Sequence, residues 1–190
     1  PSMHTVSNID KKQKMKKTRE NCSQFNYNAN ILSDSDTNLN TALDSLQSRI
    51  GQSSPATDWF EVTQDRIDGF AEVTMDHQWI HVDVEKAKSG PFGEPIAHGH
   101  LTLSIMGHLP KTESVPGPKL EGQKLSINYG FDKVRFPSPV PVGAQIRATS
   151  TLKRAEVKGG MIETMNEVVV EVEGQQKPAV VAESLGRLVF

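Results

Sequence analysis

An acid and two histidines stand within six residues of one another in the segment "DHQWIH", residues 76–81. A carboxylate beside an imidazole can carry out acid–base chemistry near neutral pH, because the imidazole accepts a proton while the acid orients a water or donates its own proton. If the segment turns around a buried Trp79, Asp76 and His81 point into one cavity. The alternative is a plain polar turn, in which Asp76 caps the turn and His81 is half-buried with its hydrogen bonds satisfied. The pair alone does not decide between these two interpretations.

The same histidines also raise the possibility of a metal site. His77 and His81 are four residues apart, and His98 and His100 follow further along the chain. The pattern lacks the glutamate that follows the first histidine in the zinc-protease motif, and the intervening tryptophan and isoleucine are poor neighbours for a hydrated ion. We therefore predict no metal site and expect His77 to be an exposed neighbour of the acid–base pair.

A second polar segment, "IAHGHLTLS", covers residues 96–104. Gly99 stands where a loop enters an apolar helix, so its backbone N–H lacks an intrahelical acceptor and no side chain keeps a ligand away. Such an amide, aided by the helix dipole, stabilises negative charge on a carbonyl oxygen, and loss of one donor of this kind typically costs about 10²–10³ in rate. The alternative is that Gly99 only permits close helix–sheet packing. Ser104 is a mid-helix serine, for which a hydrogen bond back to its own helix is the commoner arrangement.

Hydrophobic periodicity places these segments among helices and strands. Short helices are expected over residues 41–52 and 63–74, each starting at a threonine that can act as N-cap. A brief strand is expected over residues 58–62, and a mostly apolar helix of about three turns over residues 96–109. A helix that is apolar nearly all round belongs in a core.

From residue 122 onward the pattern changes to strands. They are predicted over residues 123–131, 132–136, 144–157, 161–172 and 179–190. The last three are separated by the turn-forming segments "KGG" and "EGQQKP", which predicts an antiparallel meander. Burying the apolar helix against the concave face of a curved sheet is the simplest layered arrangement, so the fold class is α+β, with a long central helix wrapped by a curved antiparallel sheet.

Composition and charge narrow the class of protein. The chain is 36% apolar and 23% charged, as in globular proteins, and a net charge of −2 gives no basic excess for binding nucleic acid. The single cysteine, Cys22, favours a reducing compartment, and no apolar run is long enough for a membrane span or a secretory signal, so a cytoplasmic location is expected. Residues 1–40 are polar and are expected to form a tail or arm, and residues 41–190 a single domain.

Three longer segments carry a resemblance to a known family. They are "MDHQWIHVD" (residues 75–83), "GPFGEPIAHGHLTLS" (90–104) and "INYGFDKVRFPSPVPVG" (127–143). In the order and spacing of these segments the chain resembles the MaoC-like (R)-specific enoyl-CoA hydratases and 3-hydroxyacyl-thioester dehydratases of the hot dog superfamily, in the branch of nodulation protein N. The resemblance covers roughly residues 41–190 and implies a hot dog fold.

The resemblance also implies roles for individual residues. Asp76 and His81 match the catalytic acid and base of the family motif, and Gly99 matches the glycine whose amide polarises the thioester carbonyl. His98 matches the histidine before that glycine, and Ser104 lies one turn before the position at which related hydratases carry a serine. His98 and Ser104 are therefore candidate substrate-binding residues.

Two residues of the family motif are replaced. Gln78 stands where the family has asparagine, and Trp79 stands where it has proline. Glutamine keeps the amide but lengthens the arm that carries it. Both residues are retained as candidate substrate-binding residues.

The resemblance implies reversible hydration of trans-2-enoyl thioesters to (R)-3-hydroxyacyl thioesters, with no metal or redox cofactor. The substrate would be a CoA or acyl-carrier thioester, whose phosphates could meet Lys133 or Arg135. A homodimer is implied as well. Two alternatives remain open: a hot dog thioesterase, and a non-catalytic acyl-thioester-binding protein that retains the fold.

Overall fold

The computed structural model describes residues 34–111 and 120–190. Most of the expected polar arm, together with Cys22, lies outside the described residues. In the part of the chain that is described, no helix is long and apolar enough to cross a membrane.

The first described helix, α2 (Asp34–Gln47), begins before the start predicted at Thr41. Leu39, Leu43 and Leu46 recur at helical spacing along one face, which packs into a small apolar cluster with the sheet. Thr41 is thus inside the helix, where its hydroxyl donates a hydrogen bond to a helix carbonyl instead of capping the end. The helix starts before residue 41 because Leu39 already lies on its buried face.

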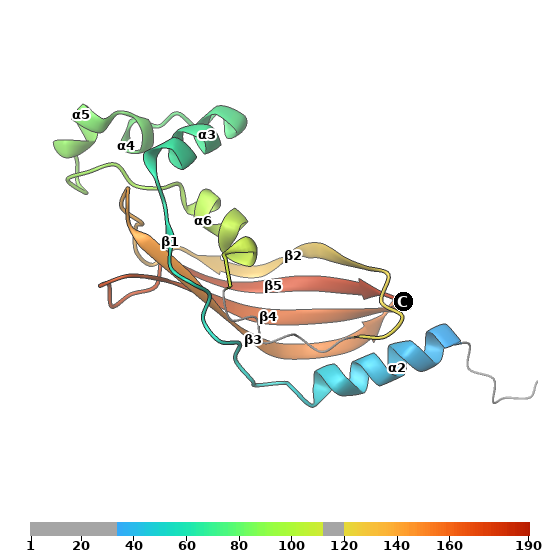
Figure 1. Cartoon of the computed structure of the whole chain (residues 1–190). Coiled ribbons are helices and arrows are strands. Elements are labelled where there is room, and N and C mark those ends of the chain that lie inside the picture. Colours follow the sequence, from blue (N-terminus) through green and yellow to red (C-terminus); the bar gives the residue numbers. More distant parts are fainter. Residues whose placement is uncertain (1–33, 112–119) are drawn as a thin grey trace, which may run out of the picture. The chain divides into compact units, whose positions relative to one another are not determined.

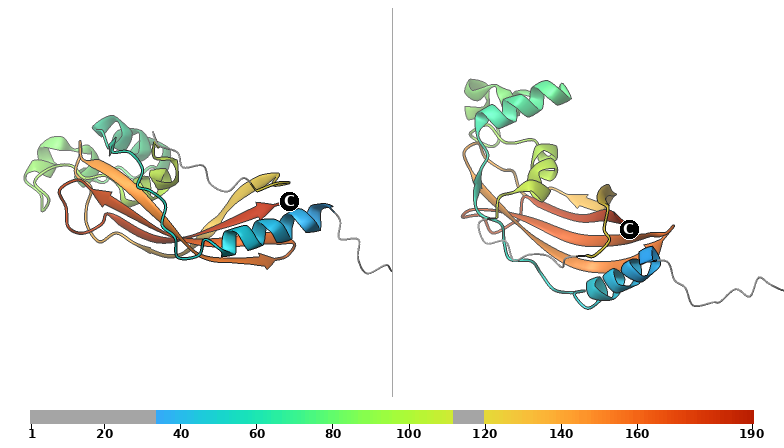
Figure 2. Two further views of the ribbon diagram at one scale, coloured as in Figure 1. Left: turned by 60° about the horizontal axis from the view of Figure 1, so that its bottom comes forward. Right: turned by 45° about the vertical axis from the view of Figure 1, so that its right-hand side comes forward.

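The described residues contain one curved antiparallel sheet of five strands. The strands are β1 (Phe60–Glu61), β2 (Leu125–Arg135), β3 (Gln145–Lys158), β4 (Met161–Val172) and β5 (Val180–Val189). Their order across the sheet is β1-β3-β4-β5-β2 (Figure 1), so the predicted meander of the last three strands is confirmed. The two strands predicted over residues 123–136 are one strand, β2, with two register shifts against β5. Figure 2 shows how the sheet curls along its length.

Strand β3 does not keep one alternation over its whole length. Ile146 and Ala148 are both buried, as the predicted alternation requires, but a register shift against β4 lies between Leu152 and Arg154. A bulge of this kind inserts one residue, so the next buried position on β3 is Ala155. The two halves of β3 therefore contribute to two different apolar clusters. One lies under helix α6, and the other lies beside α2.

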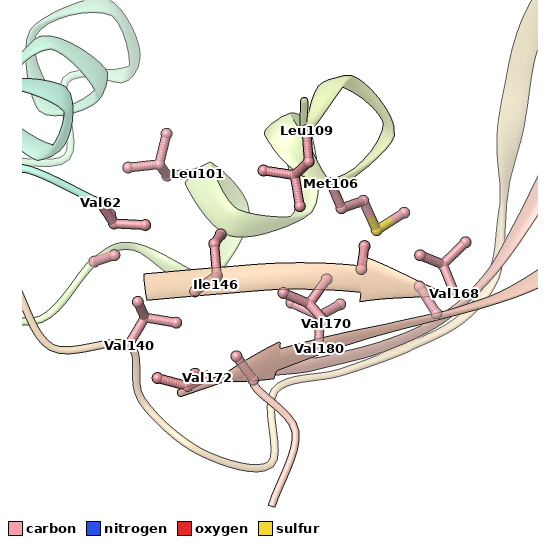
Figure 3. Close-up of a cluster of buried hydrophobic side chains, with 14 of the residues drawn as sticks. Val62, Leu101, Met106, Leu109, Val140, Ile146, Val168, Val170, Val172 and Val180 are labelled. Atoms are coloured by element: carbon pink, nitrogen blue, oxygen red, sulfur yellow. The ribbon is translucent and has the colours of Figure 1, made fainter. Parts of the chain in front are cut away.

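Helix α6 (Gly99–Ile105), extended by a 3-10 turn (Met106–His108), lies over one face of the sheet. Its inward face carries Leu101 and Met106, which meet Ile146 and the valines of β4 and β5 in the main core (Figure 3). Each such side chain contributes roughly 1.5–3 kcal/mol when fully buried. The opposite face is exposed, so the prediction of a helix buried all round is wrong for this chain: the helix is shorter than predicted, and only one side reaches the sheet.

Three further helices stand together beyond one end of the sheet (Figure 1). Helix α3 (Gln64–Thr74) begins at the predicted N-cap Thr63, whose hydroxyl accepts a hydrogen bond from the Arg66 amide. Helices α4 (Trp79–Val82) and α5 (Val84–Lys88) fall in a segment where no helix was predicted, because four or five residues are too few to show a helical period. They position the polar segment that contains the predicted acid–base pair.

Candidate active site

The candidate site forms where the end of α3, helix α4 and the start of α6 meet. Met75 ends α3 in the left-handed region, at φ 61°, and this sharp turn leads directly into Asp76. The backbone N–H of Ile96 donates to the carbonyl of Ile80, and that of Ala97 donates to Val140. These bonds hold the segment before α6 between α4 and the connection that leads from β2 into β3.

His81 is buried on α4, with 6% of its surface exposed. Its Nδ1 lies 2.6 Å from the carbonyl oxygen of Ile96, and since a carbonyl can only accept, the proton of the neutral ring is on Nδ1. Nε2 is left as a free proton acceptor. Burial lowers the pKa of His81 below its ordinary value, and the neighbouring His98 lowers it further, against the opposing effects of the Ile96 carbonyl and Asp76. His81 is therefore a neutral base at neutral pH.

His98 lies against His81 and is 2% exposed. The two imidazoles stack with ring centroids 3.7 Å apart, and the ring of Phe70 packs on His98 at 5.1 Å. Nε2 of His98 donates to the backbone carbonyl of Asp76 over 2.9 Å, so His98 fixes the loop that carries the acid. Its Nδ1 is buried with no hydrogen-bond partner among the described residues.

Asp76 is exposed, and the structure brings it to the two histidines as the acid–base interpretation predicts. One carboxylate oxygen of Asp76, one nitrogen of His81 and one nitrogen of His98 all lie within 4.8 Å of one another. That separation leaves room for a water between acid and base. The catalytic role of the pair stays a prediction.

A cavity of about 320 Å³ opens beside His81 and Gly99. A Cβ built on Gly99 would lie 3.0 Å from the ring of Phe136, so glycine allows a close contact here that a larger residue would make only if the ring shifted. Gly99 also lines the cavity, and as the first residue of α6 it has an N–H that no carbonyl of the same helix can accept. Both interpretations of Gly99 are thus compatible with its surroundings.

None of the four predicted substrate-binding residues lines this cavity, and His98 instead packs against His81. Gln78 is exposed at the start of α4, where its side chain makes no capping bond. Trp79 packs against Gly90, and the Lys86 ammonium lies 5.0 Å from the centroid of its ring. Ser104 is exposed and donates to the His100 carbonyl over 2.7 Å, the bond back to its own helix that mid-helix serines favour.

Most residues of the cavity wall were not predicted as site residues, among them Thr102 and Phe136. Thr102 is 1% exposed, and its hydroxyl has no hydrogen-bond partner within residues 34–111 and 120–190. Its position three residues after Gly99 was a usable signal, because residues three apart share a helix face, whereas Ser104 is five residues away. Phe136 gave no such signal, since it reaches Gly99 only through the folding of the sheet.

The histidines considered for a metal site separate in the structure. His77 lies 3.7 Å from Glu72 on the exposed side of α3, and the ring of His100 lies 5.7 Å from that of Phe136. The donor group that does assemble is Asp76, His81 and His98, which is not the set read from the four-residue spacing.

Comparisons with known proteins agree on one family. The family model described as "MaoC like domain" matches residues 45–174. The chain is 48% identical over 145 residues to 3-hydroxyacyl-thioester dehydratase Z of Mycobacterium tuberculosis, covering 76% of this chain and 93% of that protein. It is 42% identical over 143 residues to nodulation protein N of Rhizobium leguminosarum bv. viciae, covering 74% and 87%. Among solved structures, the (R)-hydratase from A. caviae involved in PHA biosynthesis aligns with a TM-score of 0.53 and 22% identity, covering 72% of this chain and 94% of that one.

Proposed function

Because this chain belongs to the MaoC-like domain family of hot dog hydratases and dehydratases, we propose that it catalyses the reversible hydration of trans-2-enoyl thioesters to (R)-3-hydroxyacyl thioesters. The dehydratase relative, which matches over most of both chains, supports this class of reaction. The observation that carries the site assignment is the bare Nε2 of a buried, neutral His81 beside the Asp76 carboxylate, at the wall of a cavity that Gly99 also lines.

The proposed mechanism uses His81 as the base. Nε2 takes a proton from a water held between His81 and Asp76, and the water oxygen attacks C3 of the enoyl group. The electron pair of the C2–C3 double bond moves toward the thioester carbonyl, where the Gly99 N–H stabilises the enolate-like oxygen. C2 then takes a proton on the same face from the acid–base pair. Dehydration follows the same steps in reverse.

The thioester carrier, CoA or an acyl-carrier protein, would supply binding energy remote from the reacting carbons. Lys133 is a weaker candidate for its phosphates than the sequence suggested, because its ammonium pairs with Glu183 at 2.7 Å. No resident metal or redox cofactor is required by these steps. A cytoplasmic location also stays a proposal, supported by the single cysteine.

We further propose a homodimer built on β2. This strand stands at one edge of the sheet and exposes a row of large apolar residues, each at least 40% accessible: Leu125, Ile127, Tyr129 and Phe131. An exposed apolar edge strand favours pairing with another chain. A second copy that pairs its own β2 would continue the sheet with the isologous contact typical of twofold dimers.

The decisive experiment follows loss of the enoyl-thioester absorbance when purified protein is added to crotonyl-CoA or to a medium-chain enoyl-CoA. Asp76→Asn and His81→Ala are expected to abolish turnover while remaining folded, and His77→Gln is the matched control because His77 is the exposed neighbour of Asp76. Binding of thioesters without turnover in wild type would favour the non-catalytic alternative. Release of free CoA thiol with no hydration product would identify a thioesterase instead.

A further inference from the structure

We propose that Thr102 is a specificity-determining residue whose hydroxyl binds an oxygen atom on the acyl chain of the substrate, beyond C3. The thioesters that this protein prefers then carry a keto or hydroxyl group on the acyl chain and are not plain hydrocarbons. The inference rests on the proposed function in one respect, namely that an acyl thioester occupies the cavity. It assigns no step of the acid–base chemistry to Thr102.

The hydroxyl of Thr102 is a buried polar group without a partner. The residue is 1% exposed, and its Oγ1 has no hydrogen-bond partner among residues 34–111 and 120–190. A threonine inside a helix commonly donates to a carbonyl three or four residues back, as Thr74 does to the Phe70 carbonyl over 2.6 Å. Because an unpaired buried hydroxyl costs free energy, Thr102 is suited to a partner that enters from outside the chain.

This hydroxyl belongs to the wall of the 320 Å³ cavity. The polar side chains in that wall are His81, Thr102 and Ser138. The Ser138 hydroxyl already lies 3.0 Å from the carbonyl oxygens of Lys177 and Pro178, and His81 is the proposed base. The Thr102 hydroxyl is engaged by neither role. Since no hydrogen bond holds it in place, rotation about the Cα–Cβ bond can bring it to an oxygen that enters the cavity.

Burial places Thr102 at the inner end of the cavity. Thr102, Val140 and Ala179 are between 1% and 3% exposed, whereas Phe92 and Phe136 are 45% and 42% exposed and stand at the mouth. A thioester arm is attached to a bulky carrier that stays outside, so the arm passes the mouth and the free end of the acyl chain reaches the inner end. The Thr102 hydroxyl therefore faces the acyl chain rather than the carrier arm.

The position of Thr102 on the helix fixes which part of the acyl chain it meets. Thr102 lies three residues after Gly99, about 4.5 Å further along the axis of α6. With the thioester oxygen at the Gly99 amide, the Thr102 hydroxyl lies beside carbons beyond the reacting double bond. A site that can hydrogen-bond a substrate group disfavours the analogue without it, because the polar group of the site then stays buried and unpaired.

The first test measures binding without turnover. Calorimetry on the full 190-residue chain compares hexanoyl-CoA with its 4-oxo, 5-oxo and 6-hydroxy derivatives, which have no double bond to hydrate. Wild type should bind at least one derivative about 10-fold or more tightly than hexanoyl-CoA. Thr102→Val replaces the hydroxyl by a methyl group of similar size and should remove this preference. Thr102→Ser retains the hydroxyl and should keep it.

Thr57→Val is the matched control. Thr57 is also buried, but it does not line this cavity, and its hydroxyl accepts a hydrogen bond from the Ala148 N–H over 2.9 Å. Its substitution should lower the Tm, because the Ala148 amide loses its partner, and should keep the ligand preference. Thr102→Val loses no hydrogen bond to the protein, so its Tm should not fall below that of wild type.

Equal affinity of wild type for hexanoyl-CoA and all three derivatives would overturn the inference, as would a preference that survives Thr102→Val. Turnover is measured separately, on trans-2-hexenoyl-CoA and on the enoyl form of the derivative that binds best. If Thr102→Val removes the binding preference but no thioester is hydrated, the specificity of the cavity stands and the proposed function fails. If both enoyl thioesters are hydrated with equal kcat/KM and bound equally, the function stands and the role of Thr102 fails.

Discussion

Glu163 on the sheet and the histidine pair His81 and His98 are all buried side chains, but their polar atoms are satisfied to different degrees. Glu163 on β4 is 3% exposed, and its two carboxylate oxygens receive Lys158 at 2.7 Å, Arg187 at 3.1 Å and Arg154 at 3.4 Å. The hydrogen bond from Lys158 lowers the pKa of Glu163, against the opposing effect of burial. His81 and His98, by contrast, each retain a free lone pair.

This difference distinguishes residues that stabilise the fold from residues that are available for chemistry. A buried polar cluster whose members satisfy one another rigidifies a fold, whereas incomplete pairing is tolerated where chemistry or a ligand needs the open atom. We therefore expect substitutions in the histidine pair to change activity, and substitutions around Glu163 to change stability. The predictions below test that division.

The largest effect is expected for His81→Gln. Removal of the base should lower kcat for enoyl-CoA hydration by about 10²–10⁴-fold, because general-base catalysis contributes that much. Thermal unfolding should change little, since the glutamine amide can still donate to the Ile96 carbonyl. The absorbance assay and a melting curve on the same preparation check both statements. Full kcat together with a strongly lowered Tm in this variant would reverse the roles assigned to Glu163 and to the histidine pair.

A smaller effect is expected for Gly99→Ala. The new Cβ would lie 3.0 Å from the Phe136 ring, so the ring must give by a few tenths of an ångström at the cavity wall. Because Phe136 is 42% exposed, the cost should be below the about 1–3 kcal/mol typical of overpacking in a closed core. We expect lower stability and lower kcat/KM.

The double variant Gly99→Ala/Phe136→Ala makes space for the new methyl group and distinguishes packing from chemistry. Recovery of kcat/KM in the double variant would show that Gly99 matters through the Phe136 contact. Continued loss would point to the backbone amide of residue 99.

Glu163→Gln should lower the Tm by several degrees and leave kcat near the wild-type value. The amide cannot replace the charge that Lys158, Arg154 and Arg187 share, and its loss leaves these three partly exposed cations without their common partner. Glu167→Gln is the matched control on the same strand, because its pair with Lys153 is half exposed at both ends and pairs of that kind contribute little. Equal shifts in the two variants would remove the distinction between the Glu163 network and an ordinary surface pair.

The smallest effects are expected in the dependence of stability on pH. The folded pKa of His81 is lowered, so the unfolded chain binds a proton more readily, and stability should fall as the pH drops below about 6.5 toward the folded pKa. The folded pKa of Glu163 is also lowered, so its contribution is present above about pH 4.3 and is lost as the pH falls through the folded value. Melting curves from pH 7 to 3 should show the first loss disappear in His81→Gln and the second in Glu163→Gln.

The pH profile of catalysis tests the pKa of His81 more directly than stability does. His98 is one of the causes of the lowered pKa of His81, second only to burial among those that lower it. His98→Asn should therefore move the acidic limb of the kcat/KM profile to higher pH. An unchanged limb would mean that the histidine stack does not influence the base.

Much of the fold could be read from patterns that are local in the sequence. Alternation and turn segments predicted the meander of β3, β4 and β5, and the N-cap Thr63 marked the start of α3. Helices α4 and α5 could not be predicted, because so short a helix is stabilised by the contacts around it rather than by its own periodicity. The extent of α2 was missed for a related reason: residues 34–40 are polar, and only Leu39 joins the buried face.

The sequence by itself determined the family, the curved sheet with a helix on it, and the presence of an acid and a base near a glycine-led helix. The tertiary structure alone decided which histidine stands beside Asp76. His77 is adjacent to Asp76 in the chain but turns toward Glu72, whereas His98, 22 positions away, stacks on His81 and bonds the Asp76 carbonyl. The reason is physical: the left-handed turn at Met75 and the backbone bond between Ile96 and Ile80 bring distant segments together, and neither is encoded in residue spacing.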